Sequence, residues 1–345
     1  MRPYRSLSRL ALVVSGVFLV GCVAVAADRP VDRLPDGKFT LYSGRDEALV
    51  QPLIDLFEEQ TGIQVEVRYG NTAELGALLL EEGEATPAQV FLSQDAGALG
   101  ALSQAGLFDT LPSAITDAVP AEFTSTDGSW VGVTGRARVV VFDSDVLNPN
   151  DLPDRIGAYV EPDWAGRVGV APSNASFQSF VTALRVLDGE DAAAEWVEAL
   201  SANSPQIFEG NSAILAAVDA GVVQTGLINH YYWYARAAEV GAENMRAQLK
   251  FLQAGDAGAI VNVTGAGVLS GASTDDDALE FVRFLVSREA QTYFVEQTFE
   301  YPLVPGIDAP MGLPSLESLV ITELDLSDLN DLATTQELLT RLGLI

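Results

Sequence analysis

The sequence predicts an α/β protein with two domains. Between residues 38 and 104, short apolar strands alternate with amphipathic helices, a pattern typical of a mostly parallel sheet with right-handed crossovers. The chain has 345 residues, and the part beyond its N-terminal leader, about 320 residues, exceeds what one hydrophobic core usually serves. Two extended segments, residues 136–142 and 259–263, are expected to cross between the domains and form a hinge.

Periodicity and stop signals define the elements of the first unit. Strands are expected at residues 39–42, 63–69 and 89–93, and helices at residues 46–60, 73–82 and 95–104. Thr61-Gly62 stops the first of these helices. Ligands of such sheets bind beyond the carboxyl ends of the strands, so three polar loops become candidates: residues 43–46, 70–72 and 93–95.

The second unit repeats the α/β pattern. A strand is expected at residues 168–171, and helices are expected at residues 176–187, 192–200 and 214–220. The apolar run at residues 222–228 then predicts a strand that leads into an aromatic cluster. Because small-ligand sites lie preferentially at domain interfaces, the cleft between the two units is the expected binding site.

The first residues of the chain indicate export. Arg2, Arg5 and Arg9 give a basic start, and the apolar residues 10–19 are too short to span a bilayer as a helix. Leu19-Val20-Gly21-Cys22 resembles a bacterial lipobox, which predicts a signal peptide at residues 1–21, lipidation of Cys22, a tether at residues 22–37 and a membrane-anchored periplasmic protein. The alternative is an ordinary signal-peptidase site near residues 24–26.

Charge and residue types exclude several classes of function. The net charge of −29 repels nucleic acid and anionic lipid, so no nucleic-acid partner is expected. Cys22 is the only cysteine and His230 the only histidine, which excludes an internal disulfide and the usual zinc sites. The chain has neither a Gly-x-Ser-x-Gly elbow nor a phosphate-binding Gly-x-x-x-x-Gly-Lys loop, so an enzyme is not expected.

The adjacent tyrosines Tyr231 and Tyr232 are the strongest functional signal. Neighbouring residues of a regular strand point to opposite faces, so a pair that shares one ligand must lie where a strand breaks into a loop or helix. Deprotonated phenol oxygens are hard anionic ligands that suit a hard cation, and ferric iron is the first candidate. The alternative is an aromatic core cluster that includes Trp233 and Tyr234.

Several short segments, in order along nearly the whole mature chain, resemble the bacterial periplasmic ferric-iron-binding proteins. They are residues 41–45, 81–83, 86–88, 135–141, 210–212, 227–234 and 300–303. The resemblance implies a transferrin-like, two-lobed fold of the Venus flytrap type, with one lobe at residues 38–137 plus 263–312 and the other at 138–262 plus 313–345. It also implies a monomer that delivers iron(III) to an inner-membrane ABC permease with a cytoplasmic ATPase.

The resemblance places iron on Tyr231 and Tyr232, but the chain departs from the best-known members elsewhere. Asp46 stands where those members have a histidine ligand, and Gln94, a poor anionic ligand, stands where they have a glutamate. The Ser-Gly-Arg sequence ending at Arg45 resembles the branch in which arginine holds a carbonate-type anion that completes the iron shell. A guanidinium suits that role because its fork of N–H groups matches a planar oxyanion.

The other polar candidates each have a structural alternative. Asn174 and Ser176 open a predicted helix and would bind an anion there or simply cap the helix. Arg136 would contact the anion or form an ordinary ion pair. Asp46 would be an iron ligand or would compensate the helix dipole, and Asp95 lies in the third loop. Asn211 and Asn229 would line the site or bond to the local backbone. His230 would support the tyrosine pair or pack in the core.

Two other functions are compatible with this architecture. The first is a binding protein for an organic or inorganic anion, such as a phosphonate or carboxylate, without a metal. Such a protein needs arginine and helix N-termini but gives two adjacent tyrosines no special task. The second is a sensor or adhesion lipoprotein that keeps the fold without transport.

Overall fold

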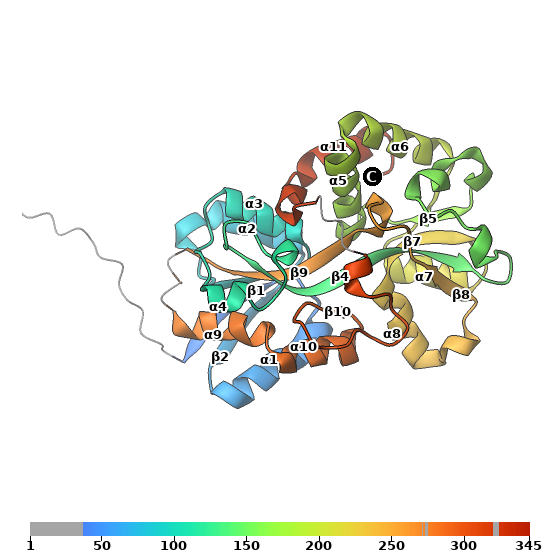
Figure 1. The fold of residues 1–345 in the computed structure, drawn as a ribbon. Helices are drawn as coiled ribbons and strands as arrows, with labels where there is room; N and C mark the ends of the chain where they lie inside the picture. The colour runs from blue at the N-terminus through green and yellow to red at the C-terminus, as the bar shows by residue number, and fades with distance from the viewer. Residues whose placement is uncertain (1–36, 271, 273–274, 320–323) are drawn as a thin grey trace, which may run out of the picture. The chain divides into compact units, whose positions relative to one another are not determined.

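One long strand, β4 (Val131–Asp143), belongs to both halves of the β-sheet (Figure 1). Its first seven residues pair with β9 and β10, and its last six pair with β7 and β8. The computed structural model describes residues 37–270, 272, 275–319 and 324–345. The predicted signal peptide, Cys22 and the tether up to residue 36 lie outside the described residues.

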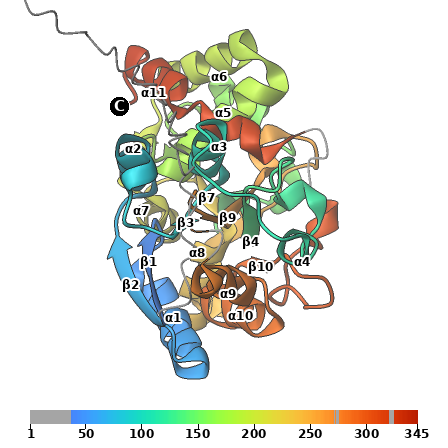
Figure 2. The same ribbon diagram turned by 90° about the vertical axis from the view of Figure 1, so that its left-hand side faces the viewer.

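The first half of the sheet has the order β2-β1-β3-β9-β4, with β10 also paired to β4. Strand β1 is parallel to β2 and β3, whereas β9 runs antiparallel to β3 and β4. The strands are β1 (Lys38–Ser43), β2 (Gln64–Tyr69), β3 (Val90–Ser93), β9 (Val261–Val268) and β10 (Tyr301–Pro302). The helices are α1 (Glu47–Thr61), α2 (Thr72–Glu82), α3 (Ala96–Gln104), α4 (Ser113–Thr116), α9 (Asp276–Leu285) and α10 (Arg288–Tyr293). Helices α2 and α3 lie on one face of this half, and α1 and α9 on the other (Figure 2).

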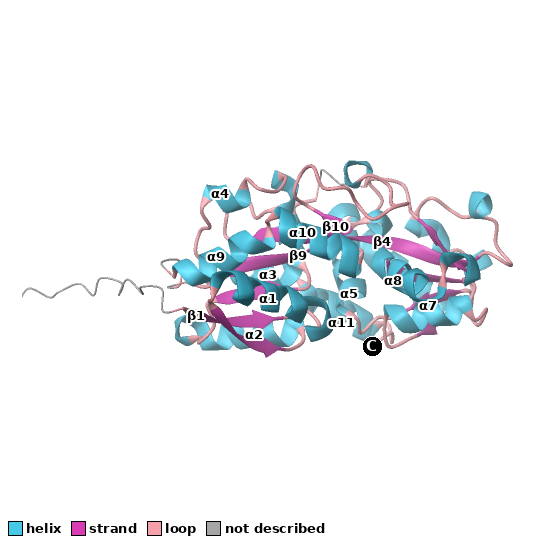
Figure 3. Ribbon diagram, turned by 90° about the horizontal axis from the view of Figure 1, so that it is seen from below, coloured by secondary structure: helices cyan, strands magenta, loops and turns pink. Residues whose placement is uncertain are grey.

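The second half has the order β4-β7-β5-β6, with β8 also paired to β4. Its strands are β5 (Val168–Val170), β6 (Gln206–Ile207), β7 (Thr225–Asn229) and β8 (Ala247–Lys250). Its helices are α5 (Ala175–Asp188), α6 (Glu190–Ala202), α7 (Asn211–Asp219), α8 (His230–Val240) and α11 (Leu332–Arg341). Figure 3 shows the strands of both halves in the middle layer, with helices around them.

Alternation along β4 gives the second half two hydrophobic cores. Val139 and Val141 belong to the core with α7, whereas Val140 and Phe142 belong to the core with α5, α6 and α11. This follows from the two-residue period of a strand, which sends neighbouring side chains to opposite faces. A strand that is covered by helices on both faces needs consecutive apolar residues, as at residues 139–142.

The predicted elements agree with the observed ones to within a few residues, but both crossings differ in detail. Strand β4 begins five residues before the predicted start at Arg136. In the other crossing, residues 257–259 form a short 3₁₀ turn and β9 begins only at Val261, because the Asp256 side chain accepts a hydrogen bond from Gly258 N. No helix within the described part of the chain combines the length and hydropathy needed to cross a membrane.

Candidate metal and anion site

The tyrosine pair lies where a strand changes into a helix. Strand β7 ends at Asn229 and α8 begins at His230, so Tyr231 and Tyr232 occupy the first turn of α8. Their rings stack, with centroids 4.3 Å apart and planes inclined by 27°. Tyr231 is buried and Tyr232 is half-buried. Both phenols therefore project from one short segment, as the sequence predicts.

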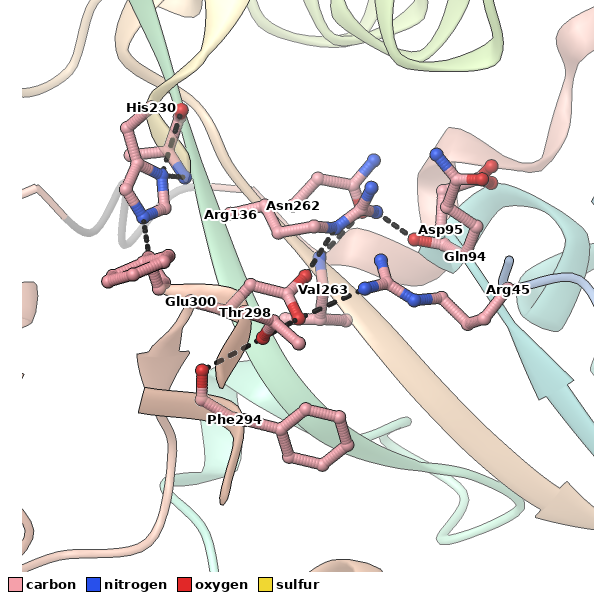
Figure 4. Close-up of polar contacts among 12 residues, drawn as sticks. Arg45, Gln94, Asp95, Arg136, His230, Asn262, Val263, Phe294, Thr298 and Glu300 are labelled. Carbon is pink, nitrogen blue, oxygen red and sulfur yellow. Dashed lines mark hydrogen bonds and ion pairs between the residues drawn. The ribbon is translucent and has the colours of Figure 1, made fainter. Parts of the chain in front are cut away.

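A buried cluster of charged side chains belongs to the same site. Arg45, in the loop after β1, donates from Nη2 to Glu300 Oε2 at 3.0 Å. Arg136, on β4, has its Nε 3.9 Å from Glu300 Oε1 and donates to the carbonyl oxygen of Gln94. In Figure 4 the Glu300 carboxylate faces both guanidinium groups. At most 1% of each of these three charged side chains is exposed.

Electrostatic coupling connects the arginines to the phenols. Burial and the neighbouring Tyr232 raise the pKa of Tyr231 well above its usual value of 10.0, while Arg45 and Arg136 act to lower it. Burial acts to lower the pKa of Arg45, but Glu300, Tyr231 and Tyr232 raise it overall. The Tyr231 phenol is therefore protonated near neutral pH, and a ligand must displace its proton to use the oxygen.

The three candidate loops after β1, β2 and β3 meet at Thr72. Its hydroxyl donates to the carbonyl oxygen of Gly44 at 3.2 Å and accepts from Gln94 N at 3.0 Å. The three polar loops that the sequence selects as candidates therefore lie together at one edge of the sheet. Asp95 caps α3 by accepting from Gly97 N and Ala98 N, and burial raises the pKa of its carboxyl.

The polar residues of the second half form one connected group. Asn174 caps α5 by accepting from Ser176 N at 3.1 Å, and Ser176 Oγ donates to the same amide oxygen at 2.6 Å. Asn211 donates to Asn174 Oδ1 at 3.2 Å and accepts from Asn229 N at 3.0 Å. The structural alternatives named for two of these residues therefore occur: Asn174 caps a helix, and Asn211 bonds to the backbone.

The structure shows the surroundings of two further candidates, Asp46 and His230. Asp46 occupies the N-cap position of α1, but its exposed side chain makes no capping hydrogen bond. His230 is fully buried, accepts at Nδ1 from Ala137 N at 3.1 Å and donates from Nε2 to Phe299 O at 2.9 Å. Burial lowers its pKa to about 4. Both ring nitrogens of His230 therefore have backbone partners, and the imidazole is neutral near pH 7.

Sequence reasoning missed Glu300 and Arg138 as members of the site. Arg138 is buried on β4, donates to Ser176 Oγ at 3.2 Å, and has its pKa lowered to about 9 by burial, with an opposing contribution from Tyr232. The only signals were the positions of Glu300 and Arg138 inside two of the family-like segments. Within the described residues, no group of three or more His, Cys, Asp or Glu side chains could hold a metal.

The fold and the site define a two-domain α/β solute-binding protein of the Venus flytrap type. Residues 85–318 match the family of bacterial extracellular solute-binding proteins. The Fe(3+)-binding periplasmic protein of Serratia marcescens is 32% identical over 342 residues, which cover 99% of this chain and 98% of that protein.

Two solved structures share the fold. Iron-bound HitA from Pseudomonas aeruginosa has a TM-score of 0.83 and 32% identity, covering 89% of this chain and 99% of HitA. The Trichodesmium protein IdiA (FutA), in complex with iron and citrate ligands, has a TM-score of 0.77 and 28% identity, covering 89% of this chain and all of that one (100%). The chain belongs to the ferric-iron-binding periplasmic proteins, the extracellular solute-binding proteins of iron ABC transport. This family consists of solute-binding proteins rather than enzymes.

Proposed function

We propose that the protein binds one ferric ion between two lobes and delivers it to an ABC permease. Tyr231 and Tyr232 supply two phenolates, and Arg45 holds an exogenous oxyanion that completes the iron shell. The observation that carries this proposal is the tyrosine pair in the first turn of α8, next to buried guanidinium groups. The lobes are residues 38–137 plus 263–312 and residues 138–262 plus 313–345.

The protonated state of Tyr231 favours a trivalent cation. Because burial raises the pKa of this phenol, only a cation that polarises oxygen strongly can replace its proton near neutral pH. Iron(III) meets this requirement far better than iron(II), calcium or magnesium. Two phenolates leave most of an octahedral shell unfilled, and no cluster of acidic or histidine side chains is present among the described residues to fill it. An anion and water are the natural remaining ligands.

Buried N–H groups without partners on Arg45 and Arg136 support the proposal that an anion binds there. Nε of Arg45 and both Nε and Nη1 of Arg136 are buried without a hydrogen-bond partner in the described structure. Buried donors normally have partners, and a planar oxyanion such as carbonate or bicarbonate would supply them. Asp46 and Gln94 lie in the loops beside this cluster, and the buried Asp95 cap holds the third loop in place.

The residues of the second half complete the cleft in this proposal. In this proposal, the amide and hydroxyl groups of Asn174, Ser176, Asn211 and Asn229, which form one hydrogen-bonded group, contact water or an outer oxygen of the anion. Delivery would occur in the periplasm, with the protein a monomer held at the membrane by lipid on Cys22. The permease and its cytoplasmic ATPase would then take the iron inward.

A direct comparison of ligands tests this function against a metal-free anion binder. Metal-free protein is titrated with ferric citrate and, separately, with phosphonates and carboxylates alone, while visible absorption and small-angle scattering are recorded. We expect a phenolate-to-iron charge-transfer band and a more compact particle only with iron, since binding must favour the closed state for closure to follow. Compaction by a metal-free anion, with no change on adding iron, would instead support the anion binder.

A further inference from the structure

The backbone before Glu300 departs from regular helix geometry. Residues Phe294–Thr298 form a π-helical turn, and Phe299 follows with a φ of 58°. Both features are uncommon, and a positive φ is unfavourable for a residue with a side chain. They bring the chain out of α10 and point Glu300 into the protein, where it is fully buried. Such local strain persists only where surrounding contacts hold it.

The contacts of Glu300 explain what this geometry achieves. Its Oε2 accepts from Arg45 Nη2 at 3.0 Å and from Thr298 Oγ1 at 2.8 Å, and its Oε1 lies 3.9 Å from Arg136 Nε (Figure 4). Oε1 has no hydrogen-bond partner within the described structure. The Glu300 carboxylate therefore lies beside two guanidinium groups from different elements, and its Oε1 remains without a hydrogen bond in the described structure.

A histidine ties this carboxylate to the helix of the tyrosine pair. His230 precedes Tyr231, and its Nε2 donates to the carbonyl oxygen of Phe299, the residue before Glu300, at 2.9 Å. Its Nδ1 accepts from Ala137 N, next to Arg136, at 3.1 Å. The two hydrogen bonds of His230 thus connect the backbone next to Tyr231, the backbone next to Glu300 and the backbone next to Arg136.

We infer that Glu300 is a positioning residue that selects the oxyanion, by holding Arg45 and Arg136 in place and cancelling one of their two positive charges. This inference rests on the proposed role of the arginines in anion binding. One net positive charge remains on the three side chains, which suits bicarbonate better than the more highly charged phosphate or citrate. Asp95 also acts on Arg136, but its carboxylate caps α3 by accepting from Gly97 N and Ala98 N, so part of its charge is balanced there.

The test compares iron binding with one oxyanion at a time. Ferric chloride from a dilute acid stock is added to metal-free protein in bicarbonate-free buffer that contains bicarbonate, phosphate or citrate alone, and the charge-transfer band gives the affinity. The variants are Glu300→Gln, Glu300→Asp and the matched control Glu296→Gln, an exposed glutamate of the same π-helical turn. Far-UV circular dichroism and thermal melting report folding.

The expected result is a change of preference, which a merely structural role would not produce. Wild type and Glu296→Gln should prefer bicarbonate, whereas in Glu300→Gln the ratio of affinities should shift toward phosphate and citrate by at least about tenfold. Glu300→Asp keeps the charge but shortens the side chain, so it should retain the preference and bind more weakly with every anion.

Three outcomes would overturn the inference. An unchanged preference in a folded Glu300→Gln would remove the selecting role. If Glu300→Gln does not fold, Glu300→Asp decides, and wild-type affinity with every anion in that variant would remove the positioning role. Wild-type protein without a tyrosine-dependent band under any anion would overturn the iron function as well, which distinguishes the failure of the two proposals.

Discussion

The guanidinium group of Arg45 donates to the carboxylate of Glu300 across 3.0 Å, although the two residues are separated by 255 positions in the sequence. The pair is buried, with side-chain exposures of 1% and 0%. Removing one partner of such a pair leaves an uncompensated buried charge, which costs about 3–5 kcal/mol of stability. The loop after β1 and the segment before β10 are thus held together where the anion is proposed to bind.

Arg45→Lys should separate the charge of this residue from its geometry. An ammonium keeps the ion pair with Glu300 but cannot present two parallel N–H groups to an oxyanion. We expect a folded protein whose iron binding retains only part of its dependence on bicarbonate, and an Arg45→Ala protein that loses that dependence almost completely. Iron titrations with and without bicarbonate measure the difference.

Arg283→Ala is the control for the arginine variants. Arg283 is half-exposed and pairs with Glu280 on the surface of α9, so its loss should change neither stability nor anion dependence. Equal iron affinity of wild-type protein with and without every small oxyanion would contradict the prediction. Protein ligands would then complete the iron shell, and Asp46 would be the first to test.

Tyr231→Phe and Tyr232→Phe should each weaken the visible charge-transfer band, and the double variant should lose it. Each change removes one anionic oxygen but keeps the ring, so the stacked pair and the start of α8 are retained. Visible titration with ferric citrate and metal analysis of purified protein measure both effects.

Tyr234→Phe is the matched control on the same helix. Tyr234 is half-buried two residues beyond the pair, and we expect its variant to keep the colour and affinity of wild type. A double Tyr231→Phe, Tyr232→Phe protein with unchanged colour and affinity would rule out the tyrosine pair as the iron site.

The parts of the structure that depend on local patterns could be predicted from the sequence. The strand at residues 63–69 shows alternation, and the helix before Gly62 shows periodicity and a stop signal; both occur close to their predicted bounds. The break after Asn229 was also predictable, because two adjacent tyrosines of a regular strand cannot share one ligand. Local chemistry thus places the tyrosine pair at the end of a strand.

The parts that depend on distant contacts could not be predicted. Nothing near Glu300 in the sequence shows that it meets Arg45, since the chain folds back through both halves of the sheet between them. The first residues of β4 include Gly132 and Gly135, which have low strand propensity and are held in the strand by pairing with β9 and β10. At these two glycines, pairing with neighbouring strands overrides the low strand propensity of the residue.

Gly44→Ala should damage the site through the backbone. A Cβ at Gly44 would overlap with Thr72 Oγ1, the hydroxyl that joins the three loops. The neighbouring loop must move, at a cost of about 1–3 kcal/mol. We expect a lower denaturation midpoint and weaker iron binding. Gly157→Ala, where a Cβ meets nothing within 4 Å, should change neither. Equal effects of the two substitutions would show that this close approach is unimportant.

His230 should give the protein a stability that is lost in acid. Its pKa is about 4 in the folded protein, against 6.5 for an unperturbed histidine, so the unfolded chain binds the proton first. The contribution is complete above pH 6.5 and falls as the pH is lowered toward 4, because the imidazolium cannot accept from Ala137 N. Over this range the loss is a few kcal/mol.

His230→Gln should remove this part of the pH dependence. The variant is expected to be less stable than wild type at pH 7.5, since a buried hydrogen bond is lost, but the difference should shrink at pH 5.5 and 4.5. Urea denaturation of both metal-free proteins at the three pH values measures the free energy of unfolding. A constant difference across this range would show that His230 does not titrate with unfolding.

Acid should release iron before it unfolds the protein. A phenol oxygen must give up its proton to bind iron, so binding to the pair expels two protons and the affinity should fall about a hundredfold per pH unit below neutrality. A Tyr232→Phe protein should show about a tenfold fall per unit, because one proton fewer is exchanged. Competition with a chelator between pH 7.5 and 6.5 measures the slope, and scattering should show the particle opening as colour is lost. An affinity that does not change over this range would mean that the iron ligands are not phenols, since phenol oxygens cannot bind the metal without giving up their protons.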